Sequence, residues 1–322
     1  MQLITAAAAL ASALDARRAA GDRIGVVPTM GALHAGHRAL IDRAVAECDT
    51  VAVTVFVNPL QFDDDADLAA YPRTLEADVE LAAAAGADIV FAPAVREMYP
   101  THPQPPATTV HVAGLSEGLE GASRPGHFDG VATVVTKLFG LAGRCRAYFG
   151  EKDFQQLAVV RRLVADLSLP VEVVACSTVR EPDGLALSSR NARLSPEERV
   201  AAVVLWRALR AGAGAIAAGE RDPGAVRQLM AGTVAAEPLA RLDYAEVVEA
   251  ATLRPAATLA GELRLLVAAT VGAVRLIDND AVVVDDARAV VSSSQSPAPE
   301  ALVGAGAGSA TVQQSVTIRK EH

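Results

Sequence analysis

The sequence predicts an α/β fold, in which a Rossmann-like doubly wound parallel sheet is followed by a smaller α+β domain. Two observations predict it. Short apolar runs alternate with longer segments of helical periodicity through the first half of the chain, and three strand-like runs follow one another further on. We expect residues 1–176 to form the first domain, residues 177–284 the second, and residues 285–322 a disordered tail rich in Ser, Pro, Gly and Ala.

The first domain begins with a helix, which we expect to be capped near Thr5. A signal peptide is the alternative, but no positive charge precedes the apolar stretch, and Arg17 and Arg18 follow it. The strands expected after this helix are 24–27, 51–57, 89–92, 147–150 and 171–175, and the helices between them are 38–47, 74–85, 131–141 and 154–167. A sheet of this kind binds ligands beyond the carboxyl ends of its strands.

The second domain is expected to begin with helices and to end in a sheet. Ser195 is followed by Pro196 and then by Glu198, a pattern typical of a helix start with a reciprocal side-chain cap. The expected elements are helices over 195–210 and 223–236 and strands over 244–249, 263–269 and 271–277.

Composition restricts the class of protein. The formal net charge of −9 argues against a broad surface for nucleic acid, because such a surface needs clustered basic residues. The three cysteines are widely spaced, which indicates neither a disulfide framework nor a zinc site and is typical of a reducing cytoplasm. No uninterrupted apolar run approaches the roughly 20 residues of a membrane span. We therefore expect a soluble cytoplasmic protein that does not bind membranes.

Two histidines stand where the first of these strands passes into a helix. His34 and His37 are three residues apart, with Gly36 between them and with Met30 and Gly31 in the preceding loop. The start of a helix gathers free backbone N–H groups and the positive end of the helix dipole, which together favour phosphate. Imidazoles there can donate hydrogen bonds to phosphoryl oxygens, and the glycine lets a ligand approach the backbone. A pair of metal ligands and a buried structural pair are the alternatives.

A second polar segment, Gly150-Glu151-Lys152-Asp153, lies at the end of another expected strand. A lysine at this place is a mobile point charge that can follow a migrating phosphoryl oxygen. The alternative is structural, with Asp153 capping the next helix beside a solvated Lys–Glu pair. Gln156, one turn into that helix, is expected to point to the same crevice and to hydrogen-bond a small polar substrate.

Two further segments can bind polar ligands. Ser188-Ser189-Arg190 follows a turn, and hydroxyls beside an arginine suit a polyphosphate, although an ordinary polar turn is the simpler interpretation. Asn58 and Gln61 follow the second of these strands, where their amides can hold a branched hydroxy acid; a plain Asn-Pro turn is the alternative. We interpret the acidic run at 63–65 as a solvated loop.

These segments resemble one known family. His34-Ala-Gly-His37 is similar to the HxGH signature of the nucleotidyltransferase superfamily, and the longer string over 27–37 resembles the pantothenate synthetase (pantoate–β-alanine ligase) family. The other matching segments, in the order of that family, are 57–62, 71–78, 124–130, 149–157 and 188–191. Two departures are Ala35, where relatives often carry an acidic residue, and Phe154, where they often carry Tyr. We expect neither to impair function.

The resemblance implies an ATP-dependent ligase that condenses pantoate with β-alanine through a pantoyl adenylate and releases AMP and pyrophosphate. It also implies a homodimer, with Mg²⁺ arriving on ATP and no dedicated metal ligands in the protein. The catalytic residues that it implies are His34, His37 and Lys152. Its ATP site comprises Met30, Gly31, His34, Gly36, His37, Gly150, Glu151, Lys152, Asp153, Val179, Leu187, Ser188, Ser189 and Arg190. Its substrate site comprises Asn58, Gln61, His127 and Gln156.

Two other functions stay open on the residues alone. Another HxGH nucleotidyltransferase would need cations around a phosphorylated acceptor, and Asn58, Gln61 and Gln156 provide none. A catalytically silent nucleotide-binding protein on the same scaffold would bind ATP without releasing pyrophosphate.

Overall fold

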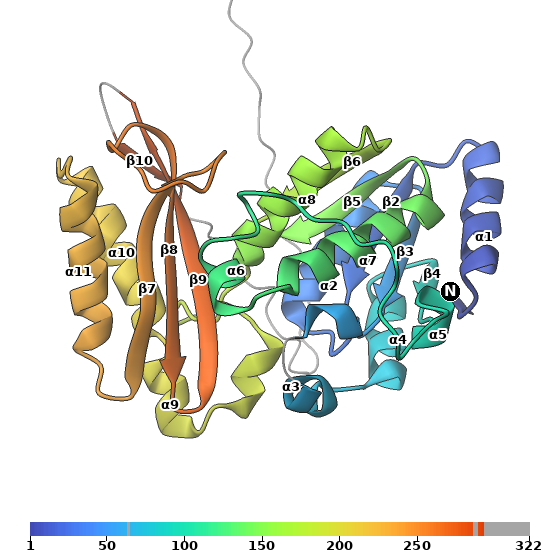
Figure 1. The fold of residues 1–322 in the computed structure, drawn as a ribbon, viewed down its shortest axis with the longest axis horizontal. Coiled ribbons are helices and arrows are strands. Elements are labelled where there is room, and N and C mark those ends of the chain that lie inside the picture. The colour runs from blue at the N-terminus through green and yellow to red at the C-terminus, as the bar shows by residue number, and fades with distance from the viewer. Residues whose placement is uncertain (63–64, 286–288, 293–322) are drawn as a thin grey trace, which may run out of the picture.

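The computed structural model describes residues 1–62, 65–285 and 289–292. Residues 63 and 64 of the acidic run, and most of the segment expected to be a tail, lie outside the described residues. Figure 1 shows a larger domain built on a parallel sheet beside a smaller domain built on an antiparallel sheet. The predicted fold class is therefore confirmed.

The parallel sheet has the strand order β1-β4-β3-β2-β5-β6. Its strands are β1 (Gln2–Ile4), β2 (Ile24–Thr29), β3 (Thr50–Val55), β4 (Ile89–Phe91), β5 (Cys145–Gly150) and β6 (Val171–Cys176). From β2 the chain builds outward through β3 and β4, and it then returns to the other side of β2 to form β5. The strand order reverses between β2 and β5, and a ligand crevice forms at such a switch point.

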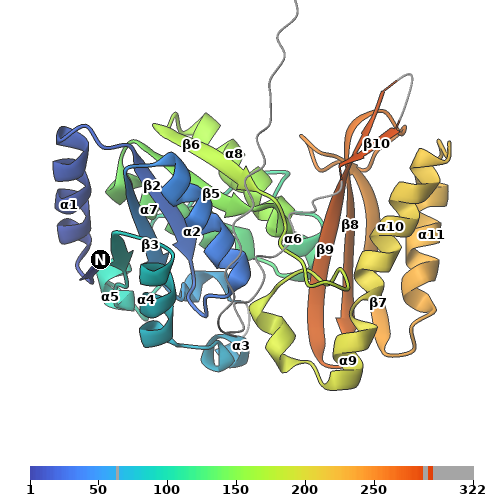
Figure 2. The ribbon, with the colours of Figure 1, turned by 180° about the vertical axis from the view of Figure 1, so that it is seen from behind.

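Helices cover both faces of this sheet (Figures 1 and 2). One face carries α1 (Ala7–Ala19), α7 (His127–Ala142) and α8 (Phe154–Asp166), whose apolar side chains share one core with the sheet. The other face carries α2 (Ala35–Glu47) and α4 (Leu75–Ala84), which pack in a second core. Short helical turns complete the domain: η1 (Pro59–Gln61), α3 (Asp65–Ala70), α5 (Val95–Met98), α6 (Glu120–Ser123) and η2 (Glu151–Asp153).

The amino-terminal segment differs from the prediction in two ways. Gln2–Ile4 form the edge strand β1, which is too short and too exposed to carry a periodic pattern. The cap predicted near Thr5 is wrong, because the helix begins after Ala6, which makes no side-chain cap. Instead, the N–H of Ala7 donates to Oε1 of Glu97 at 2.7 Å. A carboxylate that is distant in sequence thus replaces the expected local cap.

The second domain packs helices against an antiparallel sheet of order β10-β9-β8-β7. Its elements are η3 (Ser189–Arg193), α9 (Pro196–Ala201), α10 (Val204–Ala217), α11 (Pro223–Ala235), β7 (Ala240–Glu249), β8 (Gly261–Val271), β9 (Val274–Val284) and β10 (Ala289–Ser292). The predicted cap is confirmed: Ser195 Oγ accepts from the Glu198 N–H, and Glu198 Oε2 accepts from the Ser195 N–H. Two predictions need correction: the first helix is divided into α9 and α10, and Ala289–Ser292 of the expected tail pair with β9.

One helical stretch of the described chain, Pro196–Ala217, is long and apolar enough to cross a membrane by length and composition alone. Most of its apolar side chains, however, pack inside the second domain, although Val200 is 66% exposed. Leu205, Leu209 and Ile216 are all buried in the core formed with β8 and β9. The stretch, which contains α9 and α10, therefore belongs to the core of this domain.

The second domain also buries a carboxyl group, that of Asp280 in β9, which is only 1% exposed. Burial raises its pKa from 3.8 to about 6, and the charge of Arg180, the N–H of Ala281 and Arg210 at 3.7 Å offset the penalty only in part. Between about pH 4 and pH 6 the unfolded chain releases this proton while the folded protein keeps it. The free energy of unfolding contributed by Asp280 therefore falls as the pH rises through this window.

We predict that Asp280→Asn removes this penalty. The difference in unfolding free energy between the variant and the parent should shift in favour of the variant by about 2–3 kcal/mol between pH 4 and pH 7.5. Urea unfolding across this range measures the shift. Asp15→Asn, at a carboxyl that is 74% exposed, controls for the loss of one negative charge. A difference for Asp280→Asn that does not vary with pH would contradict the prediction.

Candidate active site

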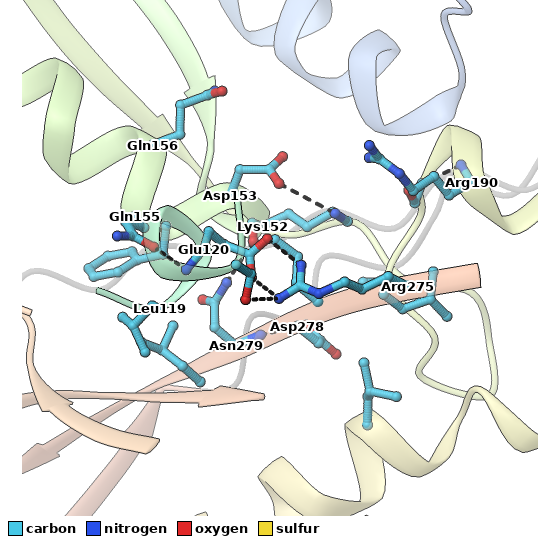
Figure 3. A pocket seen from close by; sticks show the side chains of 18 of the residues that line it. Leu119, Glu120, Lys152, Asp153, Gln155, Gln156, Arg190, Arg275, Asp278 and Asn279 are labelled. Atoms are coloured by element: carbon cyan, nitrogen blue, oxygen red, sulfur yellow. Dashed lines mark hydrogen bonds and ion pairs between the residues drawn. The ribbon is translucent and has the colours of Figure 1, made fainter. Parts of the chain in front are cut away.

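A cavity of about 210 Å³ lies at the switch point of the parallel sheet. The loops after β2 and β5 line it from the first domain, and the segment before η3 lines it from the second. A larger cavity of about 600 Å³ continues from it between the domains (Figure 3). Five side chains line both cavities: Lys152, Asp153, Gln156, Ser188 and Arg190. The two cavities therefore form one continuous site between the domains.

The two histidines at the start of α2 hold one another in place. Nδ1 of His34 accepts from the Gly36 N–H at 3.1 Å, and Nδ1 of His37 accepts from the His34 N–H at 3.3 Å. A neutral imidazole that accepts at Nδ1 carries its proton on the distal Nε2. Burial lowers the pKa of His37 to about 3, and burial together with the charge of Lys152 lowers that of His34. Both rings are thus neutral N–H donors at the wall of the smaller cavity.

Two glycines make this arrangement possible. A Cβ on Gly36 would lie 2.9 Å from Cε1 of His34, so a larger residue would displace the ring. Gly31 has φ +83°, and a Cβ there would lie 2.9 Å from Oδ2 of Asp78. The buried Asp78 carboxylate accepts from the N–H groups of Ala32 and Leu33 at 3.1 and 2.7 Å. The segment over 71–78 therefore supports the histidine loop.

Lys152 follows β5 and lines the smaller cavity together with the two histidines. It is 19% exposed, its Nζ lies 3.5 Å from Oδ1 of Asp153, and its charge acts on both imidazoles. Asp153 precedes α8 but makes no side-chain cap there, so the structural alternative for this segment is not what forms. Burial alone would raise the pKa of Asp153, yet the charges of Lys152 and Arg190 hold it below its usual value.

The second domain contributes the segment 188–190. Ser188 Oγ accepts from the Arg190 N–H at 3.2 Å, and Tyr71 of the first domain lines the smaller cavity together with Ser189. A short hairpin delivers this segment, closed by the Leu187 N–H donating to the Val179 carbonyl at 3.0 Å.

Arg180 anchors the base of that hairpin to the sheet of the second domain. Its guanidinium pairs with both carboxylate oxygens of Asp278, at 2.6 and 2.9 Å, and stacks 3.9 Å from the ring centroid of Trp206. Bidentate pairs of this kind fix orientation as well as distance. The position of the Ser188–Arg190 segment is therefore set by contacts on β9.

The predicted substrate residues form the inner wall. Nδ2 of the buried Asn58 donates to Gln61 Oε1 and to the Gly130 carbonyl, while its Oδ1 accepts from the hydroxyl of Tyr99. The Asn58 amide, held by these bonds, orients the side chain of Gln61, whose Nε2 lies against the sulfur of Met30. His127 lies beside them, with Nδ1 donating to the Gln61 carbonyl at 2.7 Å, and burial lowers its pKa to about 4.

Most of the predicted ATP residues line the smaller cavity, and three predicted site residues do not. Gly31 packs against Asp78, Glu151 pairs with Arg264 at 3.1 Å, and His127 lines only the larger cavity. Ala35, the departure inside HxGH, is exposed. Within residues 1–62, 65–285 and 289–292, no three His, Cys, Asp or Glu side chains are grouped so as to hold a metal ion.

Sequence reasoning missed several residues that shape the site. Gln155 hydrogen-bonds the Glu120 N–H and the carbonyls of Leu115 and Gly118, which fixes the loop at the larger cavity. Arg275 of the second domain pairs with Glu120 at 2.6 Å across the same cavity (Figure 3). No local pattern marks these side chains, because their partners lie far away in the sequence.

Comparison with known proteins places this geometry in a family. The model of the pantoate-beta-alanine ligase family matches residues 2–281. The pantothenate synthetase of Cereibacter sphaeroides is 57% identical over 81% of this chain and 92% of its own length. That of Moorella thermoacetica is 51% identical over 89% of this chain and 100% of its own length.

Solved structures agree with these matches. The crystal structure of pantothenate synthetase from Thermus thermophilus has a TM-score of 0.81 and 49% identity, covering 87% of this chain and 98% of that one. A pantoate-beta-alanine ligase from Francisella tularensis, described as complexed with beta-gamma ATP and beta-alanine, has a TM-score of 0.70 and 32% identity. It covers 87% of this chain and 97% of that one.

Proposed function

We propose, because this chain belongs to the pantoate–β-alanine ligase family, that the continuous site between its domains carries out both half-reactions of that family. The protein is an ATP-dependent ligase that condenses pantoate with β-alanine to pantothenate. The observation that carries the residue assignment is the convergence of His34, His37, Lys152 and Arg190 on one small cavity.

In the first half-reaction a carboxylate oxygen of pantoate attacks the α-phosphorus of ATP. The bond from that phosphorus to the bridging oxygen breaks, which gives pantoyl adenylate and pyrophosphate. A carboxylate is already a competent nucleophile, so the enzyme needs positioning and charge neutralisation more than a base. We assign the Nε2–H groups of His34 and His37, together with Lys152, to the phosphoryl oxygens, and Arg190 and Ser188 to the departing phosphates.

In the second half-reaction the neutral amine of β-alanine attacks the carbonyl carbon of the adenylate. The bond from that carbon to the phosphate oxygen breaks, AMP leaves, and the new amide nitrogen loses a proton. We assign Gln61 to hold the pantoyl group, because its amide faces the cavity while Asn58 fixes its orientation. Gln156 lines both cavities and is placed to contact β-alanine entering from the larger one.

Mg²⁺ is proposed to arrive with ATP, where it neutralises charge on the triphosphate. Asp153 supports this proposal, because its carboxylate lines both cavities and a pKa below the usual value keeps it ionised. Mg²⁺ keeps several waters when it binds phosphates, so a single carboxylate fits it. Asp153 would then accept from a water of the hydrated ion.

We also propose a cytoplasmic homodimer. The three cysteines, Cys48, Cys145 and Cys176, are buried and unpaired, which supports a reducing compartment. The homodimer is supported by the family resemblance, and light scattering of the full chain tests it. A monomer at micromolar concentration would contradict it.

Pyrophosphate release tests the function directly. With ATP, Mg²⁺ and pantoate alone, we expect one equivalent of pyrophosphate per site, and continued turnover to AMP and pantothenate only after β-alanine is added. Binding of ATP without pantoate-dependent release would instead favour another nucleotidyltransferase or a silent binding protein.

The space beside Gly150 gives a prediction about ATP affinity. A Cβ at this position would meet no protein atom within 4 Å, and Gly150 lines the smaller cavity with φ −75°, which alanine also adopts. We predict that Gly150→Ala fills ligand space and raises the Kd for ATP about tenfold, as a methyl group forced into a packed contact does. The unfolding midpoint should stay unchanged.

Gly140→Ala is the matched control, because Gly140 in α7 also has no protein atom near its Cβ position but does not line the cavity. Calorimetric titration with ATP compares the two variants. Equal affinities for ATP in Gly150→Ala and Gly140→Ala would show that the phosphates do not lie beside Gly150.

A further inference from the structure

The strand β9 of the second domain reaches the loop that carries Lys152. Nδ2 of Asn279 donates to the carbonyl of Glu151 at 3.0 Å and to the carbonyl of Lys152 at 2.8 Å. Asn279 is only 3% exposed, and it lies in the other domain from the loop that it contacts. Figure 3 shows Asn279 on this strand, close beneath the Lys152 segment.

The surroundings of Asn279 allow one orientation of its amide. Its Oδ1 accepts from Nε of Arg264 at 2.6 Å, and Arg264 also donates to Glu151 Oε2 at 3.1 Å. Two carbonyl oxygens on one side and a guanidinium N–H on the other require the amide nitrogen to face the loop. The Arg264 guanidinium stacks 4.1 Å from the ring centroid of Phe154, which fixes it in turn.

The two carbonyls belong to the peptide planes on either side of the Lys152 Cα. Each peptide unit is planar, so holding both carbonyl oxygens fixes both planes and therefore the direction of the Lys152 Cα–Cβ bond. The side chain leaves the backbone along that bond toward the smaller cavity. Asn279 thus determines the direction in which the Lys152 side chain, with its ammonium group, leaves the backbone.

We infer that Asn279 is a positioning residue for adenylation, which acts from the second domain by fixing the backbone on both sides of Lys152. This inference rests on the proposed role of Lys152. It assigns a task to Asn279, a residue that is not among the site residues predicted from the sequence. It also makes correct placement of Lys152 depend on the docking of the second domain.

A double-mutant cycle on the full-length enzyme tests the inference. The single-turnover rate of pantoyl-adenylate formation at saturating ATP is measured for the parent, Asn279→Ala, Lys152→Ala and the double variant. Asn279→Ala alone should slow adenylation about 10- to 100-fold, as displacement of a reacting group by about 1 Å does. In the Lys152→Ala background the same change should slow it by no more than about twofold, because residues that act as a unit are not additive.

Two further variants separate positioning from folding. Asn279→Asp keeps the shape of the side chain but places a carboxylate against two carbonyl oxygens. It should therefore slow adenylation, and it can replace Asn279→Ala in the cycle if the alanine variant does not fold. Asp243→Ala removes a different hydrogen bond between the domains, the one that the Ser123 hydroxyl donates to Asp243 Oδ2 at 3.2 Å, at a residue that lines neither cavity. It leaves the carbonyls of Glu151 and Lys152 untouched and should keep the rate within about twofold of the parent.

The possible outcomes test this inference separately from the proposed role of Lys152 on which it rests. An unchanged rate in Lys152→Ala overturns the proposed role of Lys152, and this inference with it. A slow Lys152→Ala enzyme in which Asn279→Ala or Asn279→Asp has the same effect with and without the lysine overturns the inference alone. Equal losses in Asp243→Ala and Asn279→Ala also overturn it, because domain docking in general would then explain both.

Discussion

Replacing Lys152 with alanine is expected to slow formation of pantoyl adenylate by about 30- to 1,000-fold, or roughly 2–4 kcal/mol in the barrier. Lys152 is 19% exposed at the junction of the two cavities, and its charge already acts on both histidines. Negative charge that migrates from the α-phosphorus toward pyrophosphate needs a cation that can follow it, and an ammonium on a flexible stem does so.

Rapid-quench measurement of a single turnover with pantoate and ATP gives this rate directly. Lys137→Ala is the matched control, because Lys137 lies in α7 with its Nζ 5.8 Å from the ring centroid of Tyr99 and lines neither cavity. Lys152→Arg tests geometry, since it keeps the charge but changes the shape of the donor. A single-turnover rate in Lys152→Ala equal to that of Lys137→Ala would overturn the catalytic role.

The fold could be predicted because its signals are local. Each central strand is a short apolar run buried on both faces, and each long helix carries an apolar stripe, so the alternation is visible in the sequence. The edge strand Gln2–Ile4 was not predicted, since three residues cannot show a period. Helix starts were also less certain: α7 begins at His127, four residues before the range predicted from its apolar face.

The site could be predicted as far as it lies on loops that follow strands. β2 and β5 are neighbours, and parallel strands end at one edge, so His34, His37 and Lys152 were expected to converge. The roles of Glu151 and Asn58 could not be predicted in the same way. Both are polar residues within matching motifs, yet the structure engages Glu151 with Arg264 and uses Asn58 to hold Gln61.

Contacts between distant segments explain what the sequence could not show. Asp78 holds the histidine loop from 45 residues away, and Asn279 holds the Lys152 loop from 127 residues away. A single side chain that bonds to backbone atoms leaves no periodic trace in its own neighbourhood. Such residues become visible only when the two segments are placed side by side.

The reciprocal cap of α2 also escaped prediction, because helix caps are expected from Ser, Thr, Asp or Asn rather than histidine. The structure shows that each histidine has two tasks: Nδ1 bonds to the backbone of the helix start, and Nε2–H is free to meet a ligand. Replacement of either residue by alanine would therefore remove a helix cap together with a phosphate contact. The two effects need different substitutions to be separated.

His37→Gln is expected to separate them. Glutamine at the third helical position is the residue that reaches back to the capping N–H in the common reciprocal cap, so it can replace Nδ1 of His37. The free energy of unfolding should then stay within about 0.5 kcal/mol of the parent, whereas His37→Ala should lose about 0.5–2 kcal/mol with the cap. Adenylation should fall about 100- to 1,000-fold in both, as it does when one preorganised donor is removed.

Urea unfolding and single-turnover adenylation of the same two variants measure both tasks. His34→Asn is a parallel case, because asparagine is a good capping residue whose side chain is too short to replace Nε2. If His37→Gln kept the parent rate, Nε2 would have no part in the reaction and the histidines would serve only as a cap. If His37→Gln unfolded as readily as His37→Ala, glutamine would not replace the bond from the His34 N–H to Nδ1 of His37, and the predicted rescue of the cap would be wrong. Stable but slow enzymes in both His37→Gln and His34→Asn would mean that the helix start is built to present two neutral imidazole donors to phosphate.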